Sequence, residues 1–153
     1  MSAQLDNLPE FRPMRDTDLD RVMEVEPALY SHPWTRGNFD DSLTAGYSCW
    51  VVECAGALIG YGVLMIGVRE AHLLNLSIAI PWQRRGIGRM LLEHFVNIAR
   101  GSDAAQMLLE VRPSNSAARR LYVAFGFREI TFRRGYYPSG RGREDALLMG
   151  ISL

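Results

Sequence analysis

The stretch from Pro81 to Phe95, PWQRRGIGRMLLEHF, decides the fold because a glycine-containing turn in it leads into an amphipathic helix. From Ile87 onward, apolar residues recur at the spacing of one helical face, through Leu91 and Phe95. The preceding segment, His72–Ile80, is nearly all apolar and is predicted to be a central strand. A strand, a short turn and a helix N-terminus together form an anion site, because backbone N–H groups point outward at a helix start.

The residue types in this turn suit a phosphate-like ligand. Gly86 and Gly88 have no Cβ, so a ligand can approach the backbone closely. Arg84, Arg85 and Arg89 add positive charge around the same point. These residues predict a phosphate or pyrophosphate ligand, and a glycine turn with solvated arginines is the alternative that they leave open.

The two common nucleotide-binding patterns do not fit this turn. The dinucleotide pattern GxGxxG would need a third glycine at the position of Leu91. The P-loop pattern, GxxxxGK followed by Ser or Thr, is absent, and the turn contains no lysine.

The composition predicts an ordinary globular protein with one domain. The chain has 153 residues, of which 48% are hydrophobic, and its 17 basic and 17 acidic residues give a formal net charge of zero. This balance argues against a nucleic-acid-binding domain. Cys49 and Cys54 lack the spacing of a metal site and are expected to be reduced thiols. The three histidines are scattered, so no metal site is expected.

Targeting and membrane signals are also missing from the sequence. The N-terminus has neither a basic nor an apolar region of the signal-peptide kind. The longest uncharged run, Ala55–Val68, is shorter than the roughly 20 apolar residues that span a bilayer. We therefore expect a cytoplasmic protein that binds neither nucleic acid nor a membrane.

Helical and strand periodicities alternate along the chain, which predicts an α/β fold built on one sheet. Thr35 is expected to cap the second helix, Asp16 or Thr17 the first, and Pro27 is expected to end or kink the first. Strands are expected at residues 10–14, 47–53, 58–68, 72–80, 106–111, 128–137 and 144–153, and helices at 16–30, 35–46, from 87 and at 115–126.

Two motifs give the chain a resemblance to a known family. Gln83–Gly88 matches R/Q-x-x-G-x-G/A, the acyl-coenzyme A pyrophosphate loop of the GNAT acetyltransferases. Asn115–Phe127, NSAARRLYVAFGF, is similar to the N-x-x-A-x-x-L-Y-x-x-x-G-F segment of the same family. The resemblance implies the GNAT fold, a single α/β domain over residues 1–153 with its core at about 11–151. Its mixed, mostly antiparallel central sheet would be flanked by helices, and its co-substrate would be acetyl-CoA.

The resemblance also implies roles for individual residues in cofactor binding. The strand before the loop would separate from its neighbour and offer backbone N–H groups to the acyl group and the pantetheine arm. Asn115 would hold the pantetheine arm. The matching cofactor-binding residues are Leu76, Ser77, Ile78, Arg84, Arg85, Gly86, Ile87, Gly88, Arg89 and Asn115.

Acetyl transfer to an amine needs a proton acceptor and a proton donor. Glu110 ends an apolar run and is the candidate general base, as in family members with the same LEVR sequence. An ion pair between Glu110 and Arg112 is the structural alternative. Tyr122 matches the proton donor of the family, and a tyrosine that only packs beside Leu121 and Phe125 is the alternative.

Other residues have weaker claims to a role. Glu70, His72 and Glu144 are less favoured candidates for the base. The closing hairpin would flank the acceptor groove, and its candidate acceptor residues are Tyr136, Tyr137, Arg143, Glu144 and Asp145. An exposed hairpin with a glycine-rich turn is the alternative for these.

The acceptor is suggested by a closer resemblance within the family. LEVRPSNSAARRLY, RRGYYPSGRGREDALLM and SHPWTRGNF resemble the members that acetylate the N-terminal alanine of small-subunit ribosomal protein eighteen. This resemblance extends from about Met14 to Met149 and implies direct attack of the amine in a ternary complex. The alternatives are other protein N-termini, a lysine or a small amine as acceptor, or a non-catalytic CoA-binding module.

Overall fold

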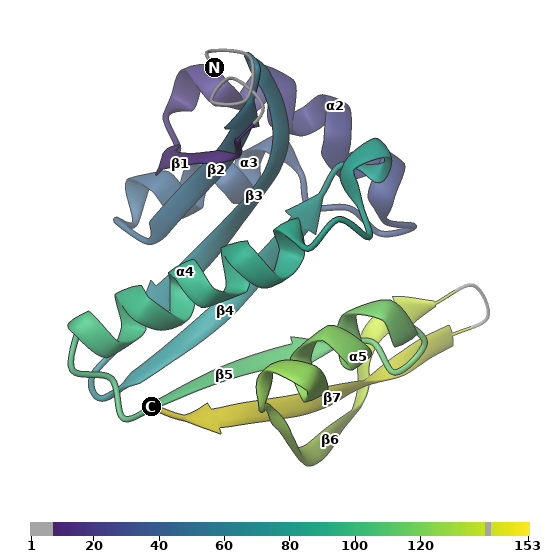
Figure 1. The fold of residues 1–153 in the computed structure, drawn as a ribbon. Coiled ribbons are helices and arrows are strands. Elements are labelled where there is room, and N and C mark those ends of the chain that lie inside the picture. The colour runs from purple at the N-terminus through teal and green to yellow at the C-terminus, as the bar shows by residue number, and fades with distance from the viewer. Residues whose placement is uncertain (1–7, 140–141) are drawn as a thin grey trace. The chain divides into compact units, whose positions relative to one another are not determined.

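The computed structural model describes residues 8–139 and 142–153, without the side chains of residues 135–144. Seven strands form one sheet in the order β1-β2-β3-β4-β5-β7-β6 (Figure 1). The strands are β1 (Glu10–Pro13), β2 (Ser48–Cys54), β3 (Ala57–Ile66), β4 (Glu70–Ile78), β5 (Gln106–Val111), β6 (Arg128–Ser139) and β7 (Gly142–Ser152). The helices are α2 (Leu19–Leu29), α3 (Arg36–Thr44), α4 (Ile87–Gly101) and α5 (Ser116–Phe125), with short 3-10 turns η1 (Asp16–Asp18) and η2 (Ile80–Trp82).

The mixed, mostly antiparallel sheet that the sequence predicts is confirmed. The β1–β2, β2–β3, β5–β7 and β6–β7 pairs are antiparallel, whereas β4 and β5 are parallel. Parallel neighbours cannot be joined by a tight hairpin and need a long crossover. The chain between β4 and β5 accordingly contains α4, the helix that begins in the quoted stretch.

The chain divides into two compact units, which are described one at a time. The first contains the residues up to 64 together with 75–92, and the second contains residues 65–74 and 93–153. Strand β4 and helix α4 contribute residues to both.

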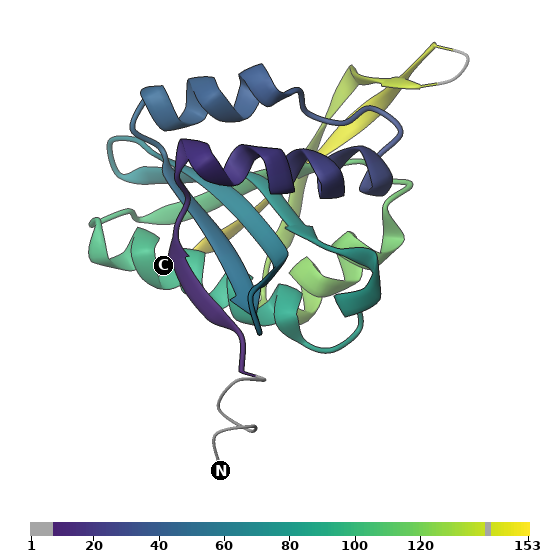
Figure 2. The same cartoon turned by 90° about the horizontal axis from the view of Figure 1, so that it is seen from above.

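In the first unit, α2 and α3 lie over one face of β2 and β3 (Figure 2). The core between them contains Val22 of α2, Phe39 of α3 and Tyr61 of β3, all fully buried. Phe39 and Tyr61 meet edge to face with ring centroids 5.6 Å apart, a geometry that aromatic pairs prefer. The helices therefore bury their apolar faces against the alternating inward positions of the strands.

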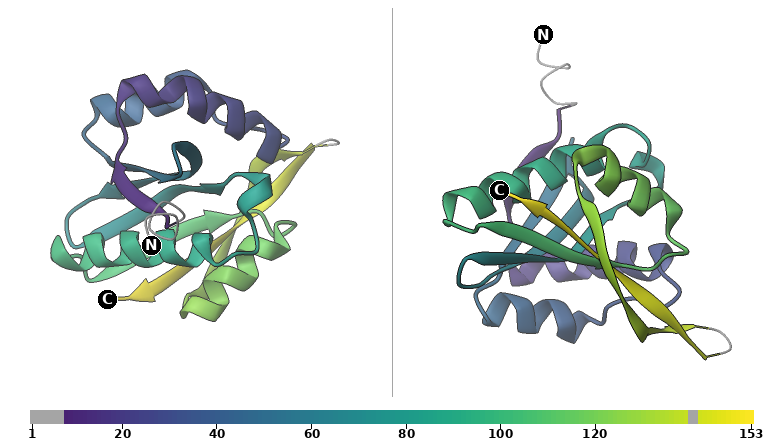
Figure 3. Two further views of the ribbon diagram at one scale, coloured as in Figure 1. Left: turned by 45° about the horizontal axis from the view of Figure 1, so that its top comes forward. Right: turned by 90° about the horizontal axis from the view of Figure 1, so that it is seen from below.

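In the second unit, α5 lies beside the long hairpin of β6 and β7 (Figure 3). Arg119 of α5 contacts Glu129 of β6 at 2.8 Å, and Phe125 and Phe127 pack with ring centroids 6.2 Å apart. Gly126 ends α5 with a φ of +122°, a conformation that favours glycine. The end of this helix is therefore where the sequence predicts it.

The predicted cap of the first helix is wrong. Neither Asp16 nor Thr17 caps α2, because the chain first makes the 3-10 turn η1. The Asp18 carboxylate instead accepts from the Arg15 N–H at 2.8 Å and from the Arg12 guanidinium at 2.6 and 2.8 Å. Pro27 does not end the helix, which continues to Leu29. Thr35 caps α3 as predicted and accepts from the Asn38 N–H at 3.1 Å.

The Arg12–Asp18 pair makes the stability of the chain depend on pH. Hydrogen bonds from Arg12 hold the pKa of the buried Asp18 carboxyl well below its usual range. Asp18 therefore stabilises the fold at pH values above the unfolded pKa of about 3.9, and this stabilisation is lost as pH falls toward the lower folded pKa. We expect Asp18→Asn to reduce the free energy of unfolding by about 2 kcal/mol at pH 7, and by progressively less below about pH 4.

Urea denaturation between pH 3 and pH 7 measures this difference. Asp20→Asn is the matched control, because Asp20 pairs with Arg36 at the exposed surface and its loss should change stability by less than about 0.5 kcal/mol. A difference between wild type and Asp18→Asn that stayed constant with pH would contradict the assignment.

Candidate active site

The turn that joins β4 to α4 has the backbone of an anion-binding loop. Arg84 and Gly86 have φ values of +61° and +81°, and the Met90 N–H donates to the Gly86 carbonyl at 3.1 Å to start α4. The preceding N–H groups, including those of Ile87 and Gly88, belong to the first turn, where a helix offers no acceptor of its own. Left-handed residues before a helix N-terminus form a concavity that favours anions.

One side chain of this loop packs into the core, and its three arginines lie at the surface. Ile87 is buried and attaches the start of α4 to the core. Arg84, Arg85 and Arg89 are exposed, and the Arg85 guanidinium lies 5.0 Å from the Trp82 ring centroid. This cation–π contact gives Arg85 a preferred position beside the loop.

The end of β4 presents two different edges. The Ala79 N–H donates to the Ile59 carbonyl of β3 at 2.8 Å, and the Ser77 carbonyl lies beside Gly60 of β3. Because backbone polar groups alternate along a strand, those of Leu76 and Ile78 point to the opposite edge.

Side chains already bind the carbonyl groups at this opposite edge. The Tyr30 hydroxyl donates to the Leu76 carbonyl at 3.2 Å, and Gln83 Nε2 donates to the Ile78 carbonyl at 2.9 Å. The register of β4 with β5 runs only from Glu70↔Gln106 to Leu73↔Leu109, so Leu76 and Ile78 lie beyond the paired part. The N–H groups of these two residues therefore face an edge on which a ligand can bind.

Glu110 lies in the second unit, near the end of β5. Its side chain is 14% exposed, and Oε1 lies 3.1 Å from Nε of Arg133 on β6. A mostly covered carboxylate beside one guanidinium can accept a proton from a group that approaches its remaining oxygen. Sequence reasoning missed Arg133, because the β6–β7 register that brings it near Glu110 is not a local pattern.

Tyr122 and Asn115 belong to α5 and its start. Tyr122 is 8% exposed, and its ring centroid lies 5.7 Å from that of Phe127. Asn115 is the N-cap of α5, where Oδ1 accepts from the Ala118 N–H at 3.2 Å. Both residues therefore make structural contacts, and their roles in catalysis and cofactor binding stay predictions.

The structure describes the side chains of only some of the weaker candidate bases and candidate acceptor residues. His72 Nε2 lies 2.8 Å from Glu70 Oε1, so these two side chains contact each other at the start of β4. Asp145 is half-buried. The side chains of Tyr136, Tyr137, Arg143 and Glu144 lie outside the described residues.

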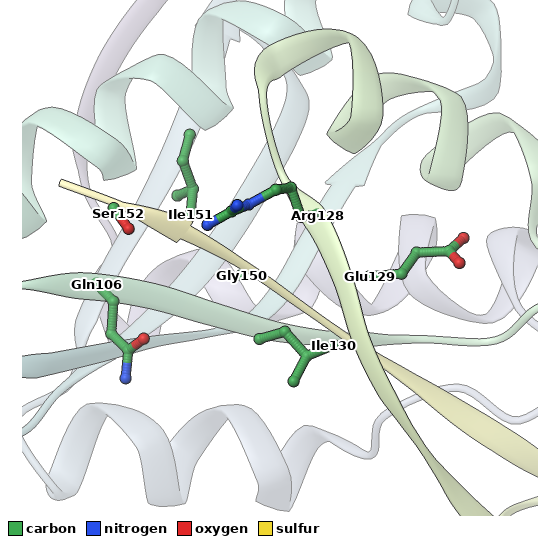
Figure 4. A pocket seen from close by; sticks show the side chains of 7 residues that line it. All are labelled: Gln106, Arg128, Glu129, Ile130, Gly150, Ile151 and Ser152. Carbon is green, nitrogen blue, oxygen red and sulfur yellow. The ribbon is translucent and has the colours of Figure 1, made fainter.

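A pocket of about 320 Å³ in the second unit contains none of the predicted site residues (Figure 4). It lies where β5 and β6 begin and β7 ends, and is lined by Gln106, Arg128, Glu129, Ile130, Gly150, Ile151 and Ser152.

The described part of the chain offers neither a metal site nor a membrane span. No group of three or more His, Cys, Asp or Glu residues there could hold a metal ion, and none of its helices has the length and apolar character needed to cross a membrane.

Comparison with known proteins identifies the family. Residues 19–127 match the acetyltransferase (GNAT) family. The chain belongs to the GNAT acetyltransferases. As a GNAT enzyme it uses acetyl-CoA, which fits the anion-binding loop at the start of α4.

Several GNAT proteins are similar to this chain over nearly its full length. The ribosomal protein bS18-alanine N-acetyltransferase of Escherichia coli K12 is 34% identical over 140 residues, covering 92% of this chain and 95% of that one. A putative enzyme of the same description from Bacillus subtilis is 33% identical, covering 93% and 94%. The crystal structure of the Escherichia coli ribosomal-protein-S18-alanine N-acetyltransferase has a TM-score of 0.88 at 33% identity, covering 95% and 94%. Ard1 from Thermoplasma volcanium shares the fold, with a TM-score of 0.86 at 24% identity.

The predicted GNAT site residues are divided between the two units. Leu76–Ile78 and the loop from Arg84 to Arg89 belong to the first, and Glu110, Asn115 and Tyr122 belong to the second. The structure brings the strand segment and the loop together through the hydrogen bond between Gln83 and Ile78.

Proposed function

We propose that this chain transfers the acetyl group of acetyl-CoA to the N-terminal alanine amine of ribosomal protein bS18. The observation that carries the proposal is the 34% identity, over 92% of the chain, to the Escherichia coli enzyme that is named for this reaction. The match covers residues of both units, so we propose that residues 1–153 act as one catalytic domain with its core at about 11–151. A ribosomal acceptor would place the reaction in the cytoplasm.

The first part of the proposal concerns the binding of acetyl-CoA. The pyrophosphate would bind the N–H groups at the start of α4, with Arg84, Arg85 and Arg89 supplying charge. The Leu76 and Ile78 N–H groups would donate to the acetyl and pantetheine carbonyls, since they face the edge of β4 away from β3. The resemblance assigns a backbone N–H role to Ser77 as well, but its backbone groups face β3, so Ser77 would contribute only by supporting this strand through its hydroxyl, which contacts Asn75 and Tyr30. The Asn115 amide would contact the pantetheine arm.

The second part concerns the chemistry. An N-terminal amine has a pKa of about 7.7–8.0, so a carboxylate can remove its proton directly or through a water molecule. Glu110 would act as this base while the amine nitrogen forms a bond to the thioester carbon. The carbon–sulfur bond then breaks, and the Tyr122 hydroxyl would donate a proton to the departing sulfur. Attack in a ternary complex needs no covalent intermediate on the enzyme.

The proposed acceptor predicts a preference for the first residue of a peptide. A peptide with the N-terminal sequence of bS18 should gain one acetyl group on its alanine amine, and kcat/KM should fall at least about tenfold when bulkier residues replace that alanine. Mass spectrometry of a panel of peptides differing only in residue one measures this. A lysine side chain or a polyamine that reacts faster than the alanine peptide would contradict the proposal.

The proposed catalytic roles predict losses in turnover rather than in cofactor binding. Glu110→Gln and Tyr122→Phe should each lower kcat about 100-fold or more, because general acid–base catalysis contributes roughly 10²–10⁴. The Kd of acetyl-CoA, measured by calorimetry, should change less than about threefold, because these groups act mainly in the transition state.

Glu70→Gln and His72→Gln are the matched controls, because both residues are candidate bases that already contact each other. Each control should retain most of the kcat. Wild-type turnover in Glu110→Gln would overturn the assignment of the base.

The proposed loop predicts a loss of cofactor affinity with the fold intact. Gly88 lies in the first turn of α4, so valine there adds bulk without requiring a left-handed backbone. Gly88→Val should raise the Kd of acetyl-CoA at least about tenfold, while the melting temperature changes by only a few degrees.

Gly101→Val is the control for this change, because Gly101 ends the same helix and faces open space. It should leave the Kd unchanged. Equal acetyl-CoA affinity in both variants would count against the loop as the pyrophosphate site.

A further inference from the structure

A buried carboxylate in the first unit has no part in the chemistry described above. Glu26, in α2, is only 1% exposed. Its carboxylate accepts from the Tyr61 hydroxyl of β3, from Asn75 Nδ2 of β4 at 3.3 Å and from the Trp34 N–H at 3.3 Å. The pKa of Glu26 is raised, because its burial outweighs these three donors, which favour the ionised form.

Hydrogen bonds continue from the partners of Glu26 along β4 to the edge of this strand that faces away from β3. Ser77 Oγ donates to Asn75 Oδ1 at 2.7 Å, and the Tyr30 hydroxyl lies 2.7 Å from Ser77 Oγ. The same Tyr30 hydroxyl lies 3.2 Å from the Leu76 carbonyl, at the edge of β4 that faces away from β3. A continuous chain of hydrogen bonds therefore joins Glu26 to the backbone of Leu76.

The carboxylate sets the direction of every bond in this chain. Glu26 Oε1 accepts from the Trp34 N–H, which can only donate, and from Asn75 Nδ2, so the Asn75 amide turns its NH₂ toward Glu26 and its oxygen toward Ser77. The single Ser77 proton is then used by Asn75, so Ser77 Oγ must accept from Tyr30. The Tyr30 hydroxyl is thereby fixed as a donor, and its single proton is shared between Ser77 Oγ at 2.7 Å and the Leu76 carbonyl at 3.2 Å. Burial keeps it protonated, because burial raises the pKa of Tyr30 to about 12.

We infer that Glu26 is a positioning residue for acetyl transfer, which acts through Asn75 and Ser77 to hold the Tyr30 hydroxyl on the Leu76 carbonyl. Tyr30 is the C-cap of α2, so the same bonds attach the end of that helix to the strand edge proposed to bind the thioester. The inference rests on the proposed function of Leu76 and Ile78. A loosened Leu76 peptide would misplace its N–H relative to the reacting carbonyl, and misplacements on this scale cost catalysis.

The substitution Glu26→Gln tests the direction of the chain with little change in volume. Glu26 accepts through both oxygens, Oε2 from Tyr61 and Oε1 from Asn75 and Trp34, whereas a glutamine keeps one oxygen, so at least one of these donors loses its acceptor. We expect kcat with the bS18 peptide to fall about tenfold or more in Glu26→Gln and in Tyr30→Phe. The Kd of acetyl-CoA should change less than about threefold, because the pyrophosphate loop is untouched.

The double variant distinguishes a connected chain from two separate effects. If Glu26 acts through Tyr30, Glu26→Gln/Tyr30→Phe should lower kcat no further than the stronger single variant. Val22→Ala is the matched control, since Val22 is fully buried in the same helix and its truncation destabilises the fold without touching the chain. Its kcat should stay near that of wild type when measured well below the melting temperature.

The outcomes separate the inference from the proposed function. A wild-type chain that acetylates no N-terminal peptide would overturn the proposed function itself. An active wild type with kcat unchanged in Tyr30→Phe, or with Val22→Ala as impaired as Glu26→Gln, would overturn only the positioning role. Tyr30→Phe removes one hydroxyl from a half-buried side chain, so it remains informative if Glu26→Gln fails to fold.

Discussion

The parallel pairing of β4 with β5 is the constraint on which the proposed site depends. Parallel strands need a crossover, and in this chain the crossover contains α4. The start of α4 therefore follows the carboxyl end of β4 directly, with only η2 and a glycine-containing turn between them. One topological requirement therefore brings together the outward-facing start of α4 and the end of β4, which lies beyond the residues paired with β5. Neither the helix start nor the strand end would by itself favour an extended ligand with two charges.

The last residues of β4 then have three different surroundings. The Ser77 carbonyl faces β3, the polar side chains of Asn75 and Ser77 face the buried Glu26, and the backbone groups of Leu76 and Ile78 face away from β3. The buried polar network and the backbone edge are consequences of the same strand periodicity. An enzyme that binds its co-substrate through backbone groups must hold that backbone still, and a fully satisfied network does this more specifically than apolar packing.

Much of this architecture could be predicted from local sequence. The cap at Thr35, the glycine end of α5 at Gly126 and the bounds of β5 each follow from residues close together in the chain. The Asp18 contacts could not be predicted, because they depend on the 3-10 turn η1, which brings the Asp18 carboxylate to the Arg15 N–H and to the Arg12 guanidinium. In the same way, the sequence predicts an apolar strand at His72–Ile80, whereas the partners of its Asn75 and Ser77, Glu26 and Tyr30, lie far away in the sequence. The loop residues were found by motif, whereas the edge that Leu76 and Ile78 share depends on pairing with β3.

The alternating directions of the backbone N–H groups along β4 can be tested directly by measuring how each amide responds to acetyl-CoA. Amide hydrogen exchange and backbone NMR shifts of Leu76, Ser77 and Ile78 can be followed as acetyl-CoA is added to the whole chain. We predict that the amide protons of Leu76 and Ile78 shift and become protected, while that of Ser77, which faces β3, changes little. A response confined to Ser77, or none at these three residues while acetyl-CoA binds, would contradict the account.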